Sequence, residues 1–299
     1  MVITTHRGIR PLALLILLPV VGLHAAPAAA ALPLWELTNT SNRIRLLGSI
    51  HFLRAADYPL NPVITAAFDD ADVVLMEIDM DDLDPEASTR TIATLAVDSK
   101  GRKLPELLGP DAWQAASSEA RELGLDLTPL APFEPWYAAI VVTQQRLAQL
   151  GFDPSYGVEA RMAADAGRRG KEIRGLETLE SQLATLDTLS PQAQRVFLQS
   201  TLEEAGEAGE IADAMIAAWQ TGDVKVLDAE LLDSVRNQPE VYRALIIRRN
   251  ENFASAIGDL VDDQEDYLIV IGALHLVGPD SVLHMLARDG IPSRQIDGR

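Results

Sequence analysis

Cysteine is absent from all 299 residues of the chain. Its absence excludes disulfide bonds, thiolate nucleophiles, a lipoprotein anchor and zinc sites built on cysteine. Positive charge is also scarce, because 25 Lys and Arg stand against 44 Asp and Glu and give a formal net charge of −19. Nucleic acids and anionic membrane surfaces bind cationic protein surfaces. Neither is therefore expected as a partner of this protein.

Long apolar runs are missing except near the N-terminus. There, residues 12–23 are almost entirely apolar, a run too short to cross the roughly 30 Å hydrocarbon core of a bilayer. Three basic residues precede the run and an alanine-rich segment with a small-x-small pattern follows it. This order is typical of a cleaved secretory signal peptide, here residues 1–30. We therefore expect a periplasmic or secreted protein of residues 31–299, without stable membrane insertion. Its formal charge becomes −21, since the signal peptide carries Arg7 and Arg10 and no acid.

Strand-like and helix-like patterns alternate along the mature chain. Residues 34–37 and 44–47 flank a turn-forming Asn-Thr-Ser-Asn sequence, which predicts a hairpin. Residues 73–78 and 267–272 are apolar nearly throughout, which is typical of strands buried on both faces of a sheet. Two shorter strands are predicted at residues 173–176 and, on an edge, at 294–296. Helical periodicity covers residues 59–70, 110–123, 135–150, 158–169, 191–219 (with a break near Gly206 or Gly209), 241–260 and 279–288.

These elements predict one α/β domain with a central mixed or mostly parallel sheet flanked by helices. Residues 79–172 contain no confident strand and are expected to form a large helical insertion that shapes a cleft but supplies no ligand to it.

Two short phrases of the same form close two of the predicted strands. Each consists of a glycine, two further residues and a histidine, at residues 48–51 and 272–275. In open α/β sheets, ligands bind beyond the carboxyl ends of the strands. We therefore expect His51 and His275 to meet in space at such a site. His284, inside the last helical pattern, is expected to face solvent.

Two charged residues fall on surfaces that should be buried. Glu77 interrupts an apolar strand, and a buried carboxylate needs a cation, a metal or a proton. Arg249 lies on the apolar stripe of its helix, whereas helical spacing turns Arg248 about 100° away, onto the face of Ala244. Arg249 should therefore be buried within reach of Glu77 or the cleft, and Arg248 exposed.

Six phrases along the chain resemble the TraB/GumN (Tiki-like) family in the same order. They are LWEL at 34–37, LLGSIH at 46–51, LMEID at 75–79, GLET with QL at 175–183, RN at 249–250 and GALHLVG at 272–278. The resemblance implies a fold shared with erythromycin-esterase-like and ChaN-like proteins. It also implies a metal-dependent peptidase with an active site of His51, Glu77, Arg249 and His275. The chain departs from the family at Glu159, where many members have Asp, and the resemblance assigns that acid no role.

The chemistry of these residues admits three readings. His51, Glu77 and His275 form a His₂Glu set that could hold Zn²⁺, Mn²⁺ or Co²⁺ with an open position for water, while Arg249 stabilises an oxyanion. This predicts a metal-dependent hydrolase that acts on peptides or proteins. The second reading is a metal-free esterase-type hydrolase in which His51 is a general base held by Glu77. The third is a non-catalytic module that binds a haem-like ligand or a partner protein.

Overall fold

The structure is a computed structural model that describes residues 31–298, so the predicted signal peptide lies outside the described residues. Its sheet has six strands in the order β4-β3-β5-β2-β1-β6. The strands β2, β5, β3 and β4 run parallel, and β1 is antiparallel to both β2 and β6. The strands are β1 (Ala31–Leu37), β2 (Ile44–Ser49), β3 (Val73–Ile78), β4 (Glu172–Glu177), β5 (Tyr267–Gly272) and β6 (Ser293–Asp297). The predicted mixed sheet, its hairpin and its final edge strand are confirmed.

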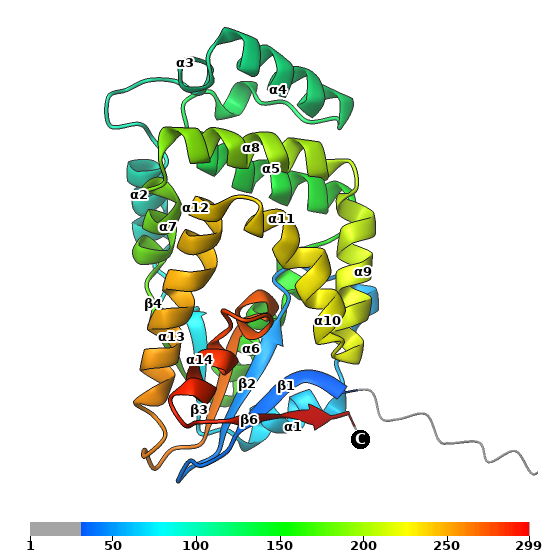
Figure 1. Cartoon of the computed structure of the whole chain (residues 1–299), viewed down its shortest axis with the longest axis vertical. Coiled ribbons are helices and arrows are strands. Elements are labelled where there is room, and N and C mark those ends of the chain that lie inside the picture. The colour runs from blue at the N-terminus through cyan, green and yellow to red at the C-terminus, as the bar shows by residue number, and fades with distance from the viewer. Residues whose placement is uncertain (1–30, 299) are drawn as a thin grey trace, which may run out of the picture.

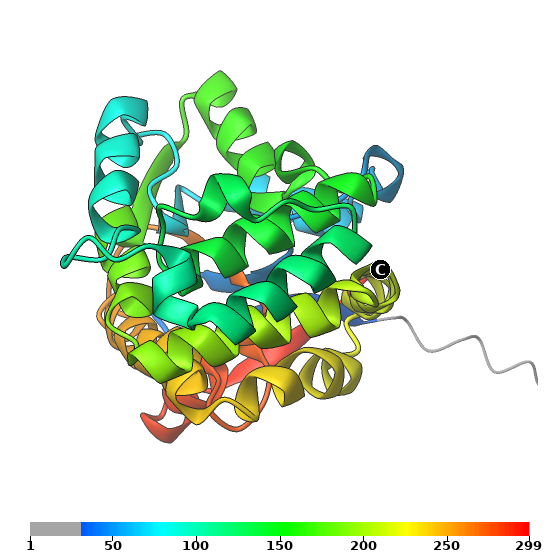
Figure 2. The same ribbon diagram turned by 90° about the horizontal axis from the view of Figure 1, so that it is seen from above.

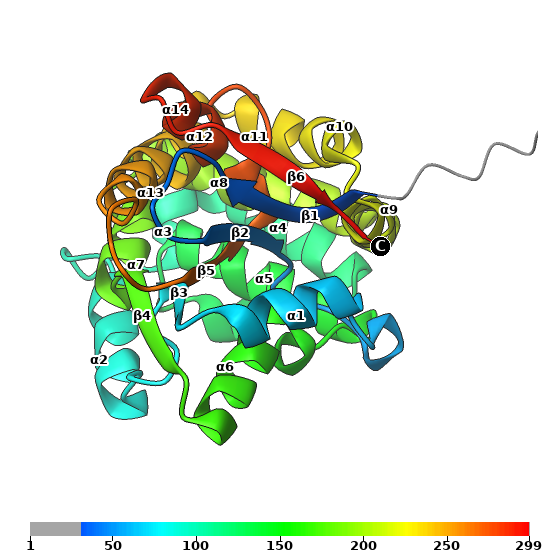
Figure 3. The ribbon, with the colours of Figure 1, turned by 90° about the horizontal axis from the view of Figure 1, so that it is seen from below.

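Helices cover both faces of the sheet, which is why its central strand is apolar throughout. On β5, Leu268 and Val270 pack into one core and Ile269 and Ile271 into another. The first core lies under α1 (Pro62–Asp70) and α6 (Val158–Arg169), and the second under α13 (Arg248–Gly258) and α14 (Val282–Arg288) (Figure 3).

A second layer of helices lies beyond the carboxyl ends of the parallel strands (Figures 1 and 2). Its centre is the packing of α5 against α8, which buries an apolar core of its own. The helices of this layer are α2 (Pro85–Leu95), α3 (Leu104–Leu108), α4 (Pro110–Glu122), α5 (Pro135–Gln149), α7 (Leu179–Asp187), α8 (Pro191–Ala205), α11 (Asp233–Arg236) and α12 (Pro239–Tyr242). From this layer α9 (Ala208–Thr221) extends to the sheet, where it packs against β1, and α10 (Val224–Leu227) follows it. Short 3-10 turns connect several elements: η1 (Ala55–Asp57), η2 (Thr128–Leu130), η3 (Pro154–Tyr156) and η6 (Ala273–Leu276).

The predicted helical insertion between β3 and β4 is present, but it makes only part of this layer. Helices α7, α8, α11 and α12, between β4 and β5, supply the rest, with the predicted break falling between α8 and α9. Helix α6 belongs instead to the sheet, because it packs against β4. Among the described residues, no helix is long and apolar enough to cross a membrane.

The helix predicted at 241–260 changes geometry part-way along its length. A π-helical segment, η5 (Arg243–Ile247), separates α12 from α13, and another, η4 (Asp228–Leu232), follows α10. A π turn takes up extra residues and so rotates the face presented by the residues before it. The placement of Ala244 on the exposed face was therefore wrong, since its side chain is fully buried.

Candidate active site

The parallel pairing of β2 with β5 brings the two glycine-histidine phrases together. Ser49 lies opposite Gly272 in the register, so that His51 and His275 follow neighbouring strand ends. A β-carbon placed on Gly272 would lie 3.4 Å from His51 Nε2, 3.6 Å from His275 Cδ2 and 3.2 Å from Glu77 Oε1. The predicted meeting of the two histidines is thus confirmed. The three functional groups therefore converge on Gly272, where a β-carbon would be in tight contact with the carboxylate of Glu77.

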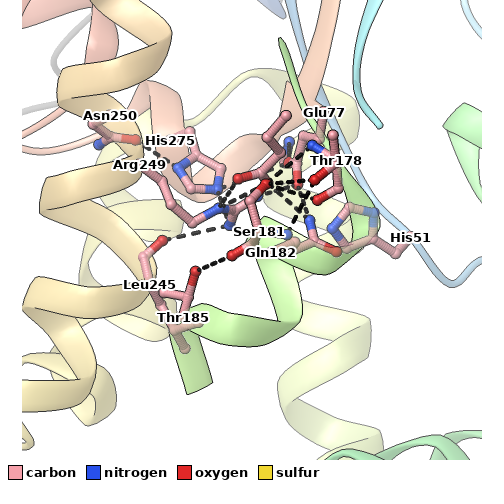
Figure 4. A network of polar contacts seen from close by, with 12 residues as sticks. His51, Glu77, Thr178, Ser181, Gln182, Thr185, Leu245, Arg249, Asn250 and His275 are labelled. Carbon is pink, nitrogen blue, oxygen red and sulfur yellow. Dashed lines mark hydrogen bonds and ion pairs between the residues drawn. The ribbon is translucent and has the colours of Figure 1, made fainter. Parts of the chain in front are cut away.

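The two neighbouring arginines are placed as helical spacing predicted. Arg249 is 9% exposed, whereas Arg248 is exposed on the surface of α13. Arg249 reaches the carboxylate of Glu77, with Nη2 donating to Oε2 at 2.5 Å. The buried carboxylate on β3 therefore has a guanidinium partner from a helix on the other side of the site (Figure 4).

Glu77 is ionised although it is almost completely buried. Its Oε1 accepts the Gly272 N–H at 2.7 Å, and its Oε2 accepts Gln182 Nε2 at 3.2 Å as well as Arg249. Burial alone would raise the pKa of Glu77, but attraction to His275 and Arg249 outweighs it and lowers the pKa to about 2. Because His275 is itself neutral near pH 7, Arg249, together with the protonated His51, keeps Glu77 charged in that range.

Every N–H of the Arg249 guanidinium is used inside the protein. The Nε donates to Glu177 at 3.0 Å, and Nη2 is shared between Glu77 and Glu177. The Nη1 contacts His275 Nε2 at 3.0 Å and the carbonyl oxygen of Leu245 at 3.4 Å. A guanidinium has five N–H donors. In this arrangement no N–H donor of Arg249 is left for a substrate oxyanion. Arg249 instead links the side chains of the buried cluster to one another.

His275 is held as a neutral imidazole with a defined tautomer. Its ring is 4% exposed, and burial lowers its pKa to about 4. Since Arg249 offers only protons, His275 Nε2 must accept, and the ring proton must sit on Nδ1. That proton points at Asn250 Oδ1, which lies 2.5 Å from His275 Nδ1. The Asn250 amide in turn donates to the carbonyl oxygen of Asp280 at 2.6 Å. Both nitrogens of His275 are thus committed to partners within the fold.

His51 differs from His275 in both exposure and charge. Its side chain is 57% exposed, and its Nδ1 lies 2.7 Å from Glu159 Oε1. The negative charge of Glu159 raises the pKa of His51 to about 9, against the opposing effect of burial. The hydroxyl of Ser49 donates to the same carboxylate oxygen. The carboxylate that orients His51 is therefore Glu159 on α6, and not Glu77 as the sequence led us to expect.

The N-terminus of α6 is fastened directly to the strand end that carries His51. The Val158 N–H donates to the carbonyl oxygen of Ile50 at 3.0 Å. A β-carbon on Gly157 would overlap the carbonyl group of His51. Residue 157 must therefore be glycine if Glu159 is to reach His51.

This close approach gives a first prediction. Replacing Gly157 by Ala should displace either the His51 backbone or α6, and we expect loss of stability by about 1–3 kcal/mol, as for an overpacked site. Gly167→Ala is the matched control, because it lies on the same helix with open space around it and Ala favours a helix interior by about 1 kcal/mol. Urea unfolding of both variants makes the comparison. A Gly157→Ala variant as stable as Gly167→Ala would show that the contact is not tight.

Comparison with known proteins identifies the family to which the chain belongs. The sequence profile of the TraB/PrgY/gumN family matches residues 33–295. The chain belongs to the TraB/PrgY/gumN family. Two relatives named "Uncharacterized protein YbaP", from Escherichia coli (strain K12) and Shigella flexneri, are each 24% identical over 255 residues, which is 85% of this chain and 92% of theirs. No solved structure matches.

Four further residues complete the site of this TraB/PrgY/gumN member. Glu177, Gln182 and Asn250 all lie in phrases that carried the resemblance, which is a signal that could have identified them. Glu159 lies inside the segment that was expected to shape the cleft only. That segment therefore also supplies a side chain to the site, because the longer Glu still reaches Ser49 and His51.

Two cavities open beside His51 and share its side chain and that of Phe52. One, of about 290 Å³, combines apolar side chains such as Met76, Ile78 and Met80 with acidic and amide groups from Glu77, Glu159 and Gln182. The other, of about 260 Å³, extends into the helical layer and has mostly apolar walls. His51 therefore stands at the junction of two largely apolar cavities, one of which is bordered by carboxylate groups, and both are reachable from solvent.

Proposed function

We propose that this TraB/PrgY/gumN-family protein is an exported hydrolase of carboxylic esters or amides, peptides included, with His51 as its general base. The observation that carries the proposal is the His51–Glu159 pair. One ring nitrogen is held 2.7 Å from a buried carboxylate, while the ring itself is more than half exposed at the junction of two cavities. A base oriented by an acid and open to solvent is the arrangement that proton abstraction from water requires.

The reaction follows from the positions of these groups. Neutral His51 accepts a proton from water at Nε2, and the resulting hydroxide attacks the substrate carbonyl carbon. The imidazolium is stabilised by Glu159 and returns the proton to the leaving oxygen or nitrogen as its bond to carbon breaks. The ionised Glu77, held by Arg249, lies beside His51 and adds to its basicity. The buried cluster therefore positions the strand end and sets the electrostatic field, while His51 carries the proton.

The second prediction concerns pH. His51 must be neutral to act as a base, and Glu159 raises its pKa to about 9. We therefore expect kcat/KM to rise with pH through about 9 and to level off above it. In Glu159→Gln the negative charge is lost, so the rise should move down towards the ordinary histidine range near pH ~6.5. A rise that stays at the same pH in Glu159→Gln would show that another group titrates.

A divalent metal held by His51, Glu77 and His275 is the second candidate, and their convergence at Gly272 is the observation that favours it. In the present arrangement the three residues do not fit a metal, because Arg249 contacts both Glu77 and His275 Nε2. Across residues 31–298, no group of three His, Asp or Glu is arranged to hold an ion. A metal at this place would require the guanidinium to move away.

Elemental analysis of the purified exported protein separates the two candidates and is the third prediction. With Arg249 as the resident cation, we expect less than one equivalent of Zn, Mn or Co and hydrolysis that withstands a chelator. One equivalent of metal that disappears in His51→Ala, together with activity lost on chelation, would support the metal enzyme instead.

The binding-module reading has weaker support. Two imidazoles with free nitrogens would be needed to ligate haem, and His275 has both nitrogens hydrogen-bonded within the fold. Of these two histidines, His51 is the one with a ring nitrogen, Nε2, that lacks a hydrogen-bond partner among the described residues.

A further inference from the structure

The apolar cavity beside His51 is built from elements that are far apart in the sequence. Its wall draws on α5, the loop that follows α5, α9, the π-helical segment η5 and η6. The side chains that give it its apolar character include Leu147, Phe152, Met215, Leu245 and Leu274. Because the cavity also borders His51, it forms part of the site already described and not a separate groove.

Apart from His51, the polar side chains in this wall have no N–H or O–H donor left for a ligand. Arg249 uses its five donors on protein atoms, and His275 uses both ring nitrogens. Ser49 donates its hydroxyl proton to Glu159. A charged or strongly polar occupant would therefore lose its water without gaining a partner, which is costly. The wall favours an uncharged hydrocarbon group.

The second cavity also has mostly apolar walls, but it differs in the hydrogen-bond acceptors at its border. Glu77 and Glu159 border it, and the mature chain as a whole is strongly acidic. An alcohol or amine that departs from a carbonyl carbon is polar and carries a hydrogen-bond donor. Such a leaving group suits the carboxylate-lined side of His51, and the acyl side of the substrate then falls in the apolar cavity.

Resting on the proposed hydrolase function, we infer that the apolar cavity is an acyl pocket, which selects substrates with an uncharged aliphatic or aromatic acyl group. Ala212 and Met215 determine its depth. They lie three residues apart on α9, on the face turned towards the cavity, and Ala212 is the smallest side chain that this helix presents there. A larger side chain at 212 occupies the space of the acyl group, and a smaller one at 215 extends it.

Acyl-chain preference tests this assignment. With p-nitrophenyl acetate, butyrate and hexanoate, kcat/KM of the natural chain should rise by about fourfold per buried methylene. Ala212→Phe should remove this rise and lose at least about tenfold on hexanoate, with acetate changed little. Ala214→Phe is the matched control, since it places the same side chain on an exposed position of the same helix. Met215→Ala should extend the rise to octanoate, which keeps the test informative if Ala212→Phe fails to fold.

Binding of the neutral dye N-phenyl-1-naphthylamine separates this inference from the proposed function. The dye should still bind to the His51→Ala variant. Adding Ala212→Phe to this variant should weaken dye binding by at least about tenfold, whereas adding Ala214→Phe should leave it unchanged. If both Phe variants bind the dye equally and keep the same ester preference, the acyl pocket is wrong even where hydrolysis depends on His51. If His51→Ala retains hydrolysis while Ala212→Phe weakens the dye, the pocket stands and the proposed base is wrong.

Discussion

Replacement of His51 by Ala is expected to lower kcat/KM for ester or peptide hydrolysis by about 10²–10⁴-fold, the usual contribution of a general base. The physical reason is that His51 Nε2 has no hydrogen-bond partner among the described residues, whereas His275 has both nitrogens engaged. The fold should survive the change, because the side chain is 57% exposed and its removal leaves no cavity in a core. Steady-state kinetics and thermal unfolding measure the two effects separately.

His284→Ala is the control for this experiment. It removes an imidazole that lies on the exposed face of α14, outside both cavities, and it should change neither rate nor stability. Activity of His51→Ala within a few-fold of the natural chain, at every pH tested, would rule out His51 as the base.

Replacement of Arg249 by Ala is expected to destabilise the protein by about 3–5 kcal/mol, the cost of leaving buried charge unpaired. Two carboxylates, Glu77 and Glu177, lose their guanidinium in this variant, and His275 loses the donor that fixes its Nε2. Arg249→Lys should recover only part of the loss, because an ammonium cannot replace a planar group that reaches five acceptors at once. Urea unfolding at constant pH measures the free energy of each variant.

Arg248→Ala provides the comparison, since it is the same chemical change one position earlier on the same helix. Arg248 is exposed, so its removal should alter the free energy of unfolding by less than about 0.5 kcal/mol. Equal stability of the Arg248 and Arg249 variants would mean that the buried ion pairs contribute nothing. Reduced activity in Arg249→Ala, with stability unchanged, would indicate instead that its guanidinium acts on the substrate.

Much of the architecture could be predicted because it depends on local patterns. Residues 267–272 are apolar on both sides, and only a strand covered by helices on two faces buries such a run. Helical periodicity over residues 158–169, followed by Gly170, placed α6 at Val158–Arg169 without error. Burial of Arg249, with exposure of its neighbour, follows from helical periodicity alone. Even so, the π turn at Arg243–Ile247 escaped prediction, because nothing in a 3.6-residue repeat marks where the repeat changes.

The sequence by itself determined the six strands and most of the longer helices, although not α2 or α7, and it determined that two histidines end adjacent strands and that a glutamate and an arginine are buried. Their partners were decided only by the tertiary structure. Glu159 reaches His51 across 108 positions because α6 begins against the strand end at Ile50. Arg249 forms ion pairs with Glu177 as well as Glu77 because β3 and β4 lie side by side. Periodicity indicates the face of a helix or strand on which a side chain lies, but the group that it contacts depends on how the helices and strands pack. That packing determines the charge of each histidine and which of its ring nitrogens are hydrogen-bonded.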